Sequence, residues 1–190
     1  MMQVPPFDLI RAFLMPSATP NGFLVPGVAL YGDSIMANGI AQRLQAAGIA
    51  VNDLSQSGDS AANAWRRFAY DLRTMGTVIL QHGTNDLSAG RDPVPYLRRM
   101  AKHAMAEGRR VMFTGVTHRE LPCAYSWLRA NDDIRKLAAD LRCTHASWNG
   151  VAYSSEDLIH PDAAMAERLV TRLMEALAQP QTAGSEEARA

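Results

Sequence analysis

Short apolar runs alternate along the chain with longer segments in which apolar residues recur at helical spacing. The runs are short for helices, and polar turn residues follow most of them, which is the pattern of strands. Residues 77–81 are almost continuously apolar, as expected for a strand buried on both faces of a parallel sheet. Strands are therefore predicted at residues 28–31, 49–54, 77–81, 110–116 and 143–146.

Between these runs, apolar residues return every three or four positions, which predicts amphipathic helices. One of them opens at Pro93 or Pro95 and ends at Gly108, following the preference for Pro at helix starts and Gly just past helix ends. The predicted helices cover residues 35–47, 61–75, 93–108, 124–142 and 162–177. Strands that alternate with helices pair in parallel, so the predicted fold class is α/β: a three-layer α/β/α sandwich with a five-stranded parallel sheet.

The two ends of the chain differ from this pattern. Residues 1–27 contain five prolines around one short amphipathic stretch, so we expect a lead-in that packs on the outside of the domain. An arm that binds another protein is the alternative for the same residues. Residues 28–178 form the predicted domain, and residues 179–190 have little to bury and are expected to be a disordered tail.

Composition narrows the functional classes. With 190 residues, 47% of them hydrophobic, the chain can bury one core. Nineteen basic and nineteen acidic residues cancel without long blocks of either sign, which predicts binding neither to nucleic acid nor to an anionic membrane. No apolar stretch has a membrane-spanning length and no signal-peptide pattern begins the chain, so we expect a cytoplasmic protein, with export by another route left open. The cysteines lack zinc-type spacing, and no cofactor or metal is expected.

Chemistry-bearing residues follow the predicted strands. In open parallel sheets, ligands bind beyond the carboxyl ends of the strands. Ser34 follows the first strand, Gly58 the second, residues 83–86 the third and residues 118–120 the fourth, so these turns are expected at one sheet edge.

A serine hydroxyl needs a base, and the base needs a group that fixes its tautomer. His160 is the best candidate among five histidines, because Asp157 lies three residues upstream and Pro161 stiffens the turn. His82, His118 and His145 could line the cleft without taking part in catalysis, and a structural role is expected for His103.

The motifs that carry a family resemblance are Gly32-Asp33-Ser34, Ser57-Gly58-Asp59, Gly83-Thr84-Asn85-Asp86 and Asp157-Leu158-Ile159-His160-Pro161. In this order they resemble the SGNH hydrolases, also called the GDSL family, over residues 28 to about 178. The resemblance implies a flavodoxin-like fold. Ile35 stands where a leucine gives the motif its name, a substitution of similar size and polarity. Met36 replaces a glycine of the nucleophile elbow, which distinguishes the site from that of α/β-hydrolases.

The resemblance implies a role for each site residue. Ser34 is the nucleophile, His160 is the general base and then acid, and Asp157 orients His160. The oxyanion hole consists of the N–H groups of Ser34 and Gly58 and the side-chain amide of Asn85. Asp33 and Asp86 stand at positions that are usually structural. Candidates for substrate contacts are Asp33, Thr84, His118 and Arg119.

The expected function is that of a serine esterase that hydrolyses short acyl esters through an acyl-enzyme on Ser34. The substrate is a small-molecule or carbohydrate ester, with O-acetyl groups on a polar alcohol favoured by the polar turns at residues 88–92 and 117–120. Trp148 and Tyr153 near the catalytic loop also favour a sugar, although packing explains them equally well. A lysophospholipase or acyl-thioesterase, or a non-catalytic binding module with the same fold, are the alternatives.

Overall fold

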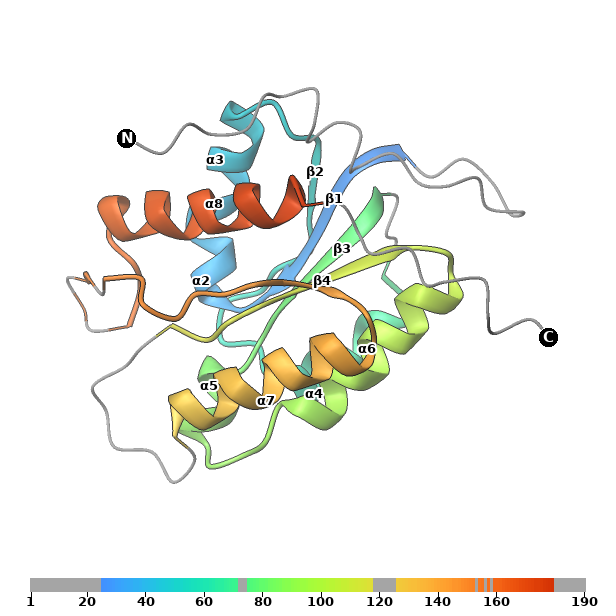
Figure 1. The fold of residues 1–190 in the computed structure, drawn as a ribbon. Coiled ribbons are helices and arrows are strands. Elements are labelled where there is room, and N and C mark those ends of the chain that lie inside the picture. Colours follow the sequence, from blue (N-terminus) through green and yellow to red (C-terminus); the bar gives the residue numbers. More distant parts are fainter. Residues whose placement is uncertain are drawn as a thin grey trace.

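A computed structural model describes residues 25–71, 75–117, 126–152, 154–155, 157 and 159–179. Its five strands form one parallel sheet in the order β2-β1-β3-β4-β5 (Figure 1). The sheet therefore confirms the predicted α/β class and the five-stranded parallel arrangement. The strands are β1 (Val25–Gly32), β2 (Val51–Asp53), β3 (Met75–Gln81), β4 (Arg110–Thr114) and β5 (Thr144–Ala146).

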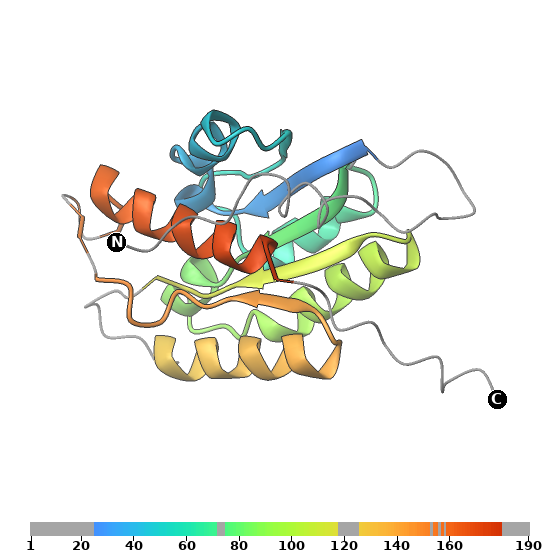
Figure 2. The ribbon, with the colours of Figure 1, turned by 45° about the horizontal axis from the view of Figure 1, so that its top comes forward.

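Helices cover both faces of the sheet and complete the three layers. The helices are α2 (Ser34–Ala37), α3 (Ile40–Ala46), α4 (Ala61–Phe68), α5 (Thr84–Ser88), α6 (Val94–Ala106), α7 (Trp127–Asp140) and α8 (Ala163–Leu177). In Figures 1 and 2, α2, α3 and α8 lie on one face, while α4, α6 and α7 lie on the other. Two hydrophobic clusters, one on each face, make up the core.

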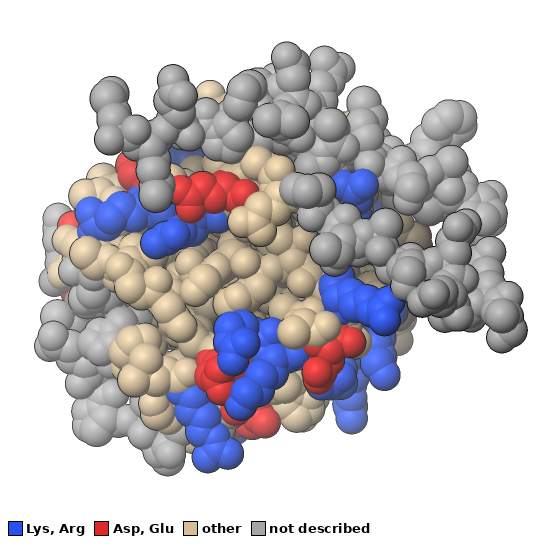
Figure 3. Space-filling model, in the orientation of Figure 1, with Lys and Arg blue, Asp and Glu red and all other residues tan. Residues whose placement is uncertain are grey.

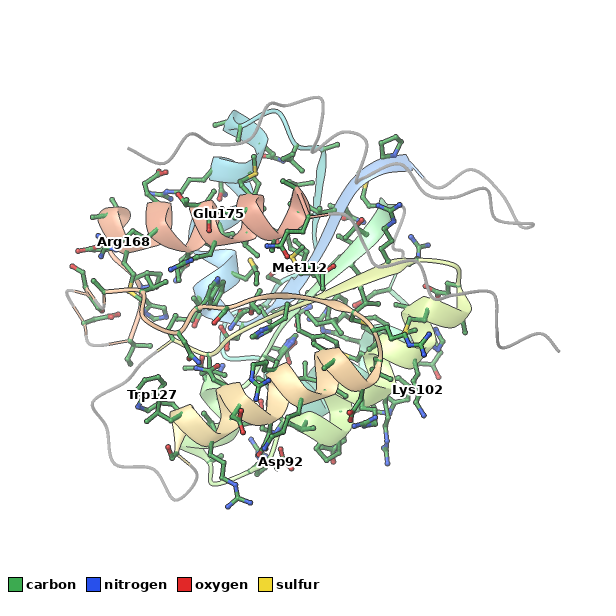
Figure 4. The ribbon with its side chains drawn as sticks, viewed as in Figure 1. Asp92, Lys102, Met112, Trp127, Arg168 and Glu175 are labelled. Atoms are coloured by element: carbon green, nitrogen blue, oxygen red, sulfur yellow. The ribbon has the colours of Figure 1, made fainter. Side chains whose placement is uncertain are left out.

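Alternation along the strands explains why the sheet is buried on both sides. Val28 and Leu30 of β1 belong to the cluster beneath α3 and α8, whereas Ala29 and Tyr31 belong to the cluster beneath α4 and α6. All four side chains are fully buried. Met112 of β4, labelled in Figure 4, is fully buried on the α8 side. This two-sided burial is the physical reason for the nearly continuous apolar runs in the sequence.

Several element boundaries differ from the sequence-based expectations. Strand β1 begins at Val25, inside the segment assigned to the lead-in, because Val25 pairs with Met75 of β3. The same pairing places Met75 in a strand, although the helix predicted at residues 61–75 included it. That helix ends at Phe68. Residues 1–24 and 180–190, with the proposed interaction arm and tail, lie outside the described residues.

Two further differences arise from local backbone geometry. The helix predicted over residues 35–47 is divided into α2 and α3 at Gly39, whose φ of 91° is left-handed and incompatible with a continuous helix. The turn after β3 contains the short helix α5, which was expected only as a turn. Both changes fall at the carboxyl ends of strands, where the chain reverses within few residues.

Charged side chains are intermixed on the surface. Figure 3 shows basic and acidic residues side by side on one face, and ion pairs such as Arg135–Asp132 and Arg172–Glu175 connect neighbours on one helix. Among the described helices, none is long and apolar enough to cross a membrane.

Asn131 of α7 ties the loops after β4 and β5 to the helical layer. Its Oδ1 accepts a hydrogen bond from Val116 N at 2.6 Å, and its Nδ2 donates to Val116 O at 3.0 Å and to Asn149 Oδ1 at 2.8 Å. Asn131 is only 1% exposed. A Cβ at Gly115 would lie 2.9 Å from Asn131 Oδ1, so the backbone of this loop passes directly over the amide.

We expect Asn131→Ala to lower the free energy of unfolding by about 2–4 kcal/mol, because the buried N–H and C=O groups of Val116 lose their partners. Urea denaturation followed by circular dichroism measures the change. Asn149→Ala is the matched control. It removes only the bond at the exposed end and should cost about 1 kcal/mol or less. Equal losses in the two variants would contradict this account.

Candidate active site

Ser34 lies at the carboxyl end of β1, where the strand gives way to helix α2. Asp33 is the N-cap of that helix, and its Oδ1 accepts a hydrogen bond from Ile35 N at 2.9 Å. Ser34 is the first helical residue and is partly exposed. Because the first N–H groups of a helix have no acceptor within it, the Ser34 N–H can serve a bound group. Gly32 is needed here, since a Cβ would lie 2.6 Å from Met36 Cβ.

His160 and Asp157 form a close pair in the loop before α8. The imidazole Nδ1 lies 2.6 Å from Asp157 Oδ2, while Asp157 Oδ1 accepts hydrogen bonds from His160 N at 2.7 Å and Ile159 N at 2.9 Å. The backbone N–H of His160, its imidazole and the Ile159 N–H hold the pKa of Asp157 well below its usual range. The carboxylate is therefore ionised at neutral pH and can fix the tautomer of His160.

The loop that carries His160 is fastened to the start of α8. Asp162 caps this helix by accepting a hydrogen bond from Met165 N at 2.7 Å, and it also accepts one from the Ser154 hydroxyl. Further along α8, Arg168 Nη2 donates to Ala152 O at 2.9 Å; Arg168 is labelled in Figure 4. These contacts hold both ends of the loop, so they restrict the positions open to His160.

Helix α2, which begins at Ser34, and helix α8, which follows the His160 loop, lie on the same face of the sheet. Ile35 and Met36 of α2 share a hydrophobic cluster with Met165 and Ala166 of α8. In Figures 1 and 2, α2, α5 and the loop into α8 lie near the carboxyl ends of the strands. The fold thus brings together α2, which begins at Ser34, and α8, which follows the loop with His160, on one face of the sheet, although they are far apart in the sequence.

Gly58 comes from the loop after β2 and Asn85 from helix α5, which follows β3; β2 and β3 are the two neighbours of β1. Gly58 is exposed with a φ of 76°, a conformation that favours glycine, and a Cβ there would meet nothing within 4 Å. Asn85 Nδ2 donates to Asp59 O at 2.8 Å, so the Asn85 amide is tied to the residue after Gly58. The bonds from Gln56 N to Gly32 O, at 3.0 Å, and from Asp33 N to Gln81 O, at 3.2 Å, join these loops to the end of β1.

Two of the four residues expected to contact the substrate are buried, and the other two lie outside the described residues. Asp33 is completely buried and Thr84 is 3% exposed, so neither side chain is open to a substrate in this structure. Burial raises the pKa of Asp33. His118 and Arg119 lie outside the described residues, as does Tyr153. Trp148 is only 4% exposed and belongs to the core, which favours the packing interpretation of this aromatic residue.

A polar cluster next to the β2–α4 loop was not expected from the sequence. Arg67 of α4 donates to Asp59 Oδ2 at 2.7 Å, and His82 Nε2 lies 3.4 Å from the same oxygen. Burial alone would raise the pKa of Asp59, but the hydrogen bonds from His82 and Arg67 outweigh it and lower that pKa. An Asp and an Arg eight positions apart are too common to indicate this contact from sequence alone.

Two observations on the described residues concern thiol and metal chemistry. Burial raises the pKa of the Cys143 thiol to about 11, so this cysteine is a poor nucleophile at neutral pH. Within the described part of the chain, no group of three or more His, Cys, Asp or Glu side chains is arranged to hold a metal ion.

Comparison with protein-family models and with curated protein sequences gives no match. Among solved structures, the chain resembles TesA with a TM-score of 0.64 and 24% identity, over 80% of this chain and 97% of that one. A GDSL-like lipase from Bacteroides thetaiotaomicron has a TM-score of 0.62 and 18% identity, over 79% and 86% of the two chains. Axe2, an acetylxylan esterase from Geobacillus stearothermophilus, has a TM-score of 0.66 and 13% identity, over 82% and 95%. The chain therefore has the fold of the GDSL-like lipase and the acetylxylan esterase, as its motifs led us to expect.

Proposed function

We propose that this protein is a serine esterase of the SGNH hydrolase family, with Ser34, His160 and Asp157 as its catalytic triad. The observation that carries the proposal is the 2.6 Å contact between His160 Nδ1 and Asp157 Oδ2. With Nδ1 engaged by a carboxylate, Nε2 is the ring nitrogen that can take a proton from a hydroxyl. Ser34 at the carboxyl end of β1 supplies such a hydroxyl at the sheet edge where ligands bind in this class of fold.

The proposed reaction has two halves. Ser34 Oγ attacks the ester carbonyl while His160 Nε2 accepts the hydroxyl proton, and the oxyanion accepts hydrogen bonds from Ser34 N, Gly58 N and Asn85 Nδ2. The C–O bond to the alcohol then breaks, and the alcohol leaves with the proton from His160. In the second half, His160 takes a proton from water, the hydroxide attacks the acyl-enzyme, and Ser34 regains a proton as the acid departs.

For the substrate, we propose a short acyl ester of a polar alcohol, such as an O-acetylated carbohydrate. The exposed polar segment at residues 88–92, which starts at the last residue of α5, supports an alcohol that forms hydrogen bonds. The similarity to Axe2, described as an acetylxylan esterase, is consistent with this choice. The similarity to a GDSL-like lipase keeps a lysophospholipase or acyl-thioesterase as the second candidate.

Hydrolysis of p-nitrophenyl acetate and p-nitrophenyl octanoate tests both the esterase activity and the preference for a short acyl group. With a Ser34→Ala variant as the blank, we expect hydrolysis of the acetyl ester with kcat/KM about tenfold or more above that of the octanoyl ester. A preference for octanoate would favour the lipase or thioesterase alternative. No hydrolysis above the blank with either ester would favour a non-catalytic binding module.

A further inference from the structure

Arg67 is the centre of a polar cluster that joins helix α4 to the end of β1. Its Nη2 donates to Asp59 Oδ2 at 2.7 Å and its Nη1 to Asp71 Oδ2 at 2.6 Å. The guanidinium carbon lies 4.3 Å from the centre of the Tyr31 ring, and the Tyr31 hydroxyl donates to the same oxygen of Asp71. The side chain of Arg67 is 20% exposed and that of Asp59 only 6%. This ion pair is largely shielded from water, so its geometry is held more firmly than that of a surface pair.

Asp59 connects this cluster to two of the three proposed oxyanion-hole donors, the Gly58 N–H and the Asn85 amide. It directly follows Gly58, whose N–H is one proposed donor, and its carbonyl oxygen accepts from the Asn85 amide at 2.8 Å. The orientation of Asp59 therefore sets the direction of the Gly58 peptide and the rotamer of Asn85 together. Arg67 and the buried His82 both contact its carboxylate at Oδ2.

We propose that Arg67 is a positioning residue for the oxyanion hole, acting through Asp59 on Gly58 and Asn85. This inference rests on the proposed esterase function. Arg67 touches no reacting atom in the proposal. It holds the loop that carries one donor, Gly58 N, and that accepts a hydrogen bond from a second donor, the Asn85 amide. A misplacement of about 1 Å in such donors can cost about 100-fold in rate, so the position of one loop is enough to matter.

The geometry also explains why the residue is an arginine. A planar guanidinium presents separate N–H groups to two carboxylates at once and lies flat against an aromatic ring. A lysine carries one compact charge and cannot hold Asp59 and Asp71 in the same way while it covers Tyr31. We therefore expect Arg67→Lys to restore only part of the function that Arg67→Met loses.

Steady-state kinetics with p-nitrophenyl acetate provides the first test. Arg67→Met should lower kcat by about 10- to 100-fold and leave KM within about twofold, because the donors act mainly in the transition state. Arg66→Met is the matched control. Arg66 is the exposed neighbour on the same helix, and its replacement should leave both constants unchanged.

The same change in an Asn85→Ala background separates positioning from general damage. If Arg67 acts through Asn85, its loss should cost much less once the amide is absent, since coupled residues are not additive. An undiminished loss in that background, a loss confined to KM, or no loss in Arg67→Met would overturn the inference. If Arg67→Met fails to fold by circular dichroism, Arg67→Lys and Asp59→Asn take its place in the same cycle.

A readout independent of activity keeps the inference distinct from the proposed function. In ¹H–¹⁵N spectra, Arg67→Met should shift the Gly58 amide and the Asn85 side-chain amide, whereas Arg66→Met should not. Unchanged resonances at both groups would overturn the positioning role whatever the kinetics. Absence of Ser34-dependent hydrolysis in the wild type would instead count against the esterase proposal, while the spectra still decide whether Arg67 positions this loop.

Discussion

Replacing either Ser34 or His160 by alanine should lower kcat for p-nitrophenyl acetate by about 10⁶-fold, and the double variant should be no slower than either single variant. The reason is that the nucleophile and its base act in one step. Without the imidazole the hydroxyl keeps its proton, and without the hydroxyl the imidazole has nothing to activate. The measurement is kcat under saturating ester, with circular dichroism to confirm that each variant is folded.

His103 provides a matched control for the histidine. It lies on α6, which begins after α5 at the carboxyl edge and runs back toward the start of β4, so His103 is near the opposite edge of the sheet. Its ring packs against Trp65 and Phe68, and its Nε2 pairs with Glu107 at 3.3 Å. His103→Gln should change kcat by less than about threefold. A small loss in His160→Ala together with a large loss in His103→Gln would refute the assignment of the base.

The three central strands, β1, β3 and β4, could be predicted from the sequence because they are buried on both faces. That burial demands apolar residues at nearly every position, and such runs stand out from segments with helical spacing. The boundaries were less predictable where pairing between distant segments decides them. Met75 has the spacing of a helical residue, but in the structure it pairs with Val25 at the far end of β1. No local pattern encodes that contact.

The same distinction between local pattern and tertiary contact applies to the candidate site. Its place after the first predicted strand was enough to nominate Ser34, because parallel topology sends the carboxyl end of every strand to one edge. His160 was nominated by Asp157 three residues upstream and by Pro161 directly after it. Burial of individual side chains was not predictable. Asp33 follows a strand and precedes a helix, which suits a substrate contact and a helix cap equally well, and the structure buries it as a cap. The contact of Arg67 with Asp59 depends on how α4 packs against the loop before it.

The lowered pKa of Asp157 leads to a prediction about how the rate depends on pH. Hydrogen bonds hold its pKa below the ordinary value of 3.8, so its folded form favours the carboxylate. A depressed carboxyl pKa gives a contribution to stability that is complete above the ordinary value and is lost as pH falls through the lower, folded value. Asp157 is therefore ionised from about pH 6 to pH 9, and a change of rate within that range has to come from another group.

Replacing Asp157 by asparagine should lower kcat by about 10⁴-fold across that pH range, and it should be at least as harmful as Asp157→Ala. The backbone N–H groups of Ile159 and His160 both donate to Asp157 Oδ1, so an asparagine would place its carbonyl oxygen there. Its NH₂ group would then face His160 Nδ1 and donate to it, which puts the ring proton on Nε2 and removes the base from Ser34. Alanine has no donor and leaves both tautomers open. Steady-state rates of the two variants decide the matter, and a faster Asp157→Asn would contradict the assigned hydrogen bonds.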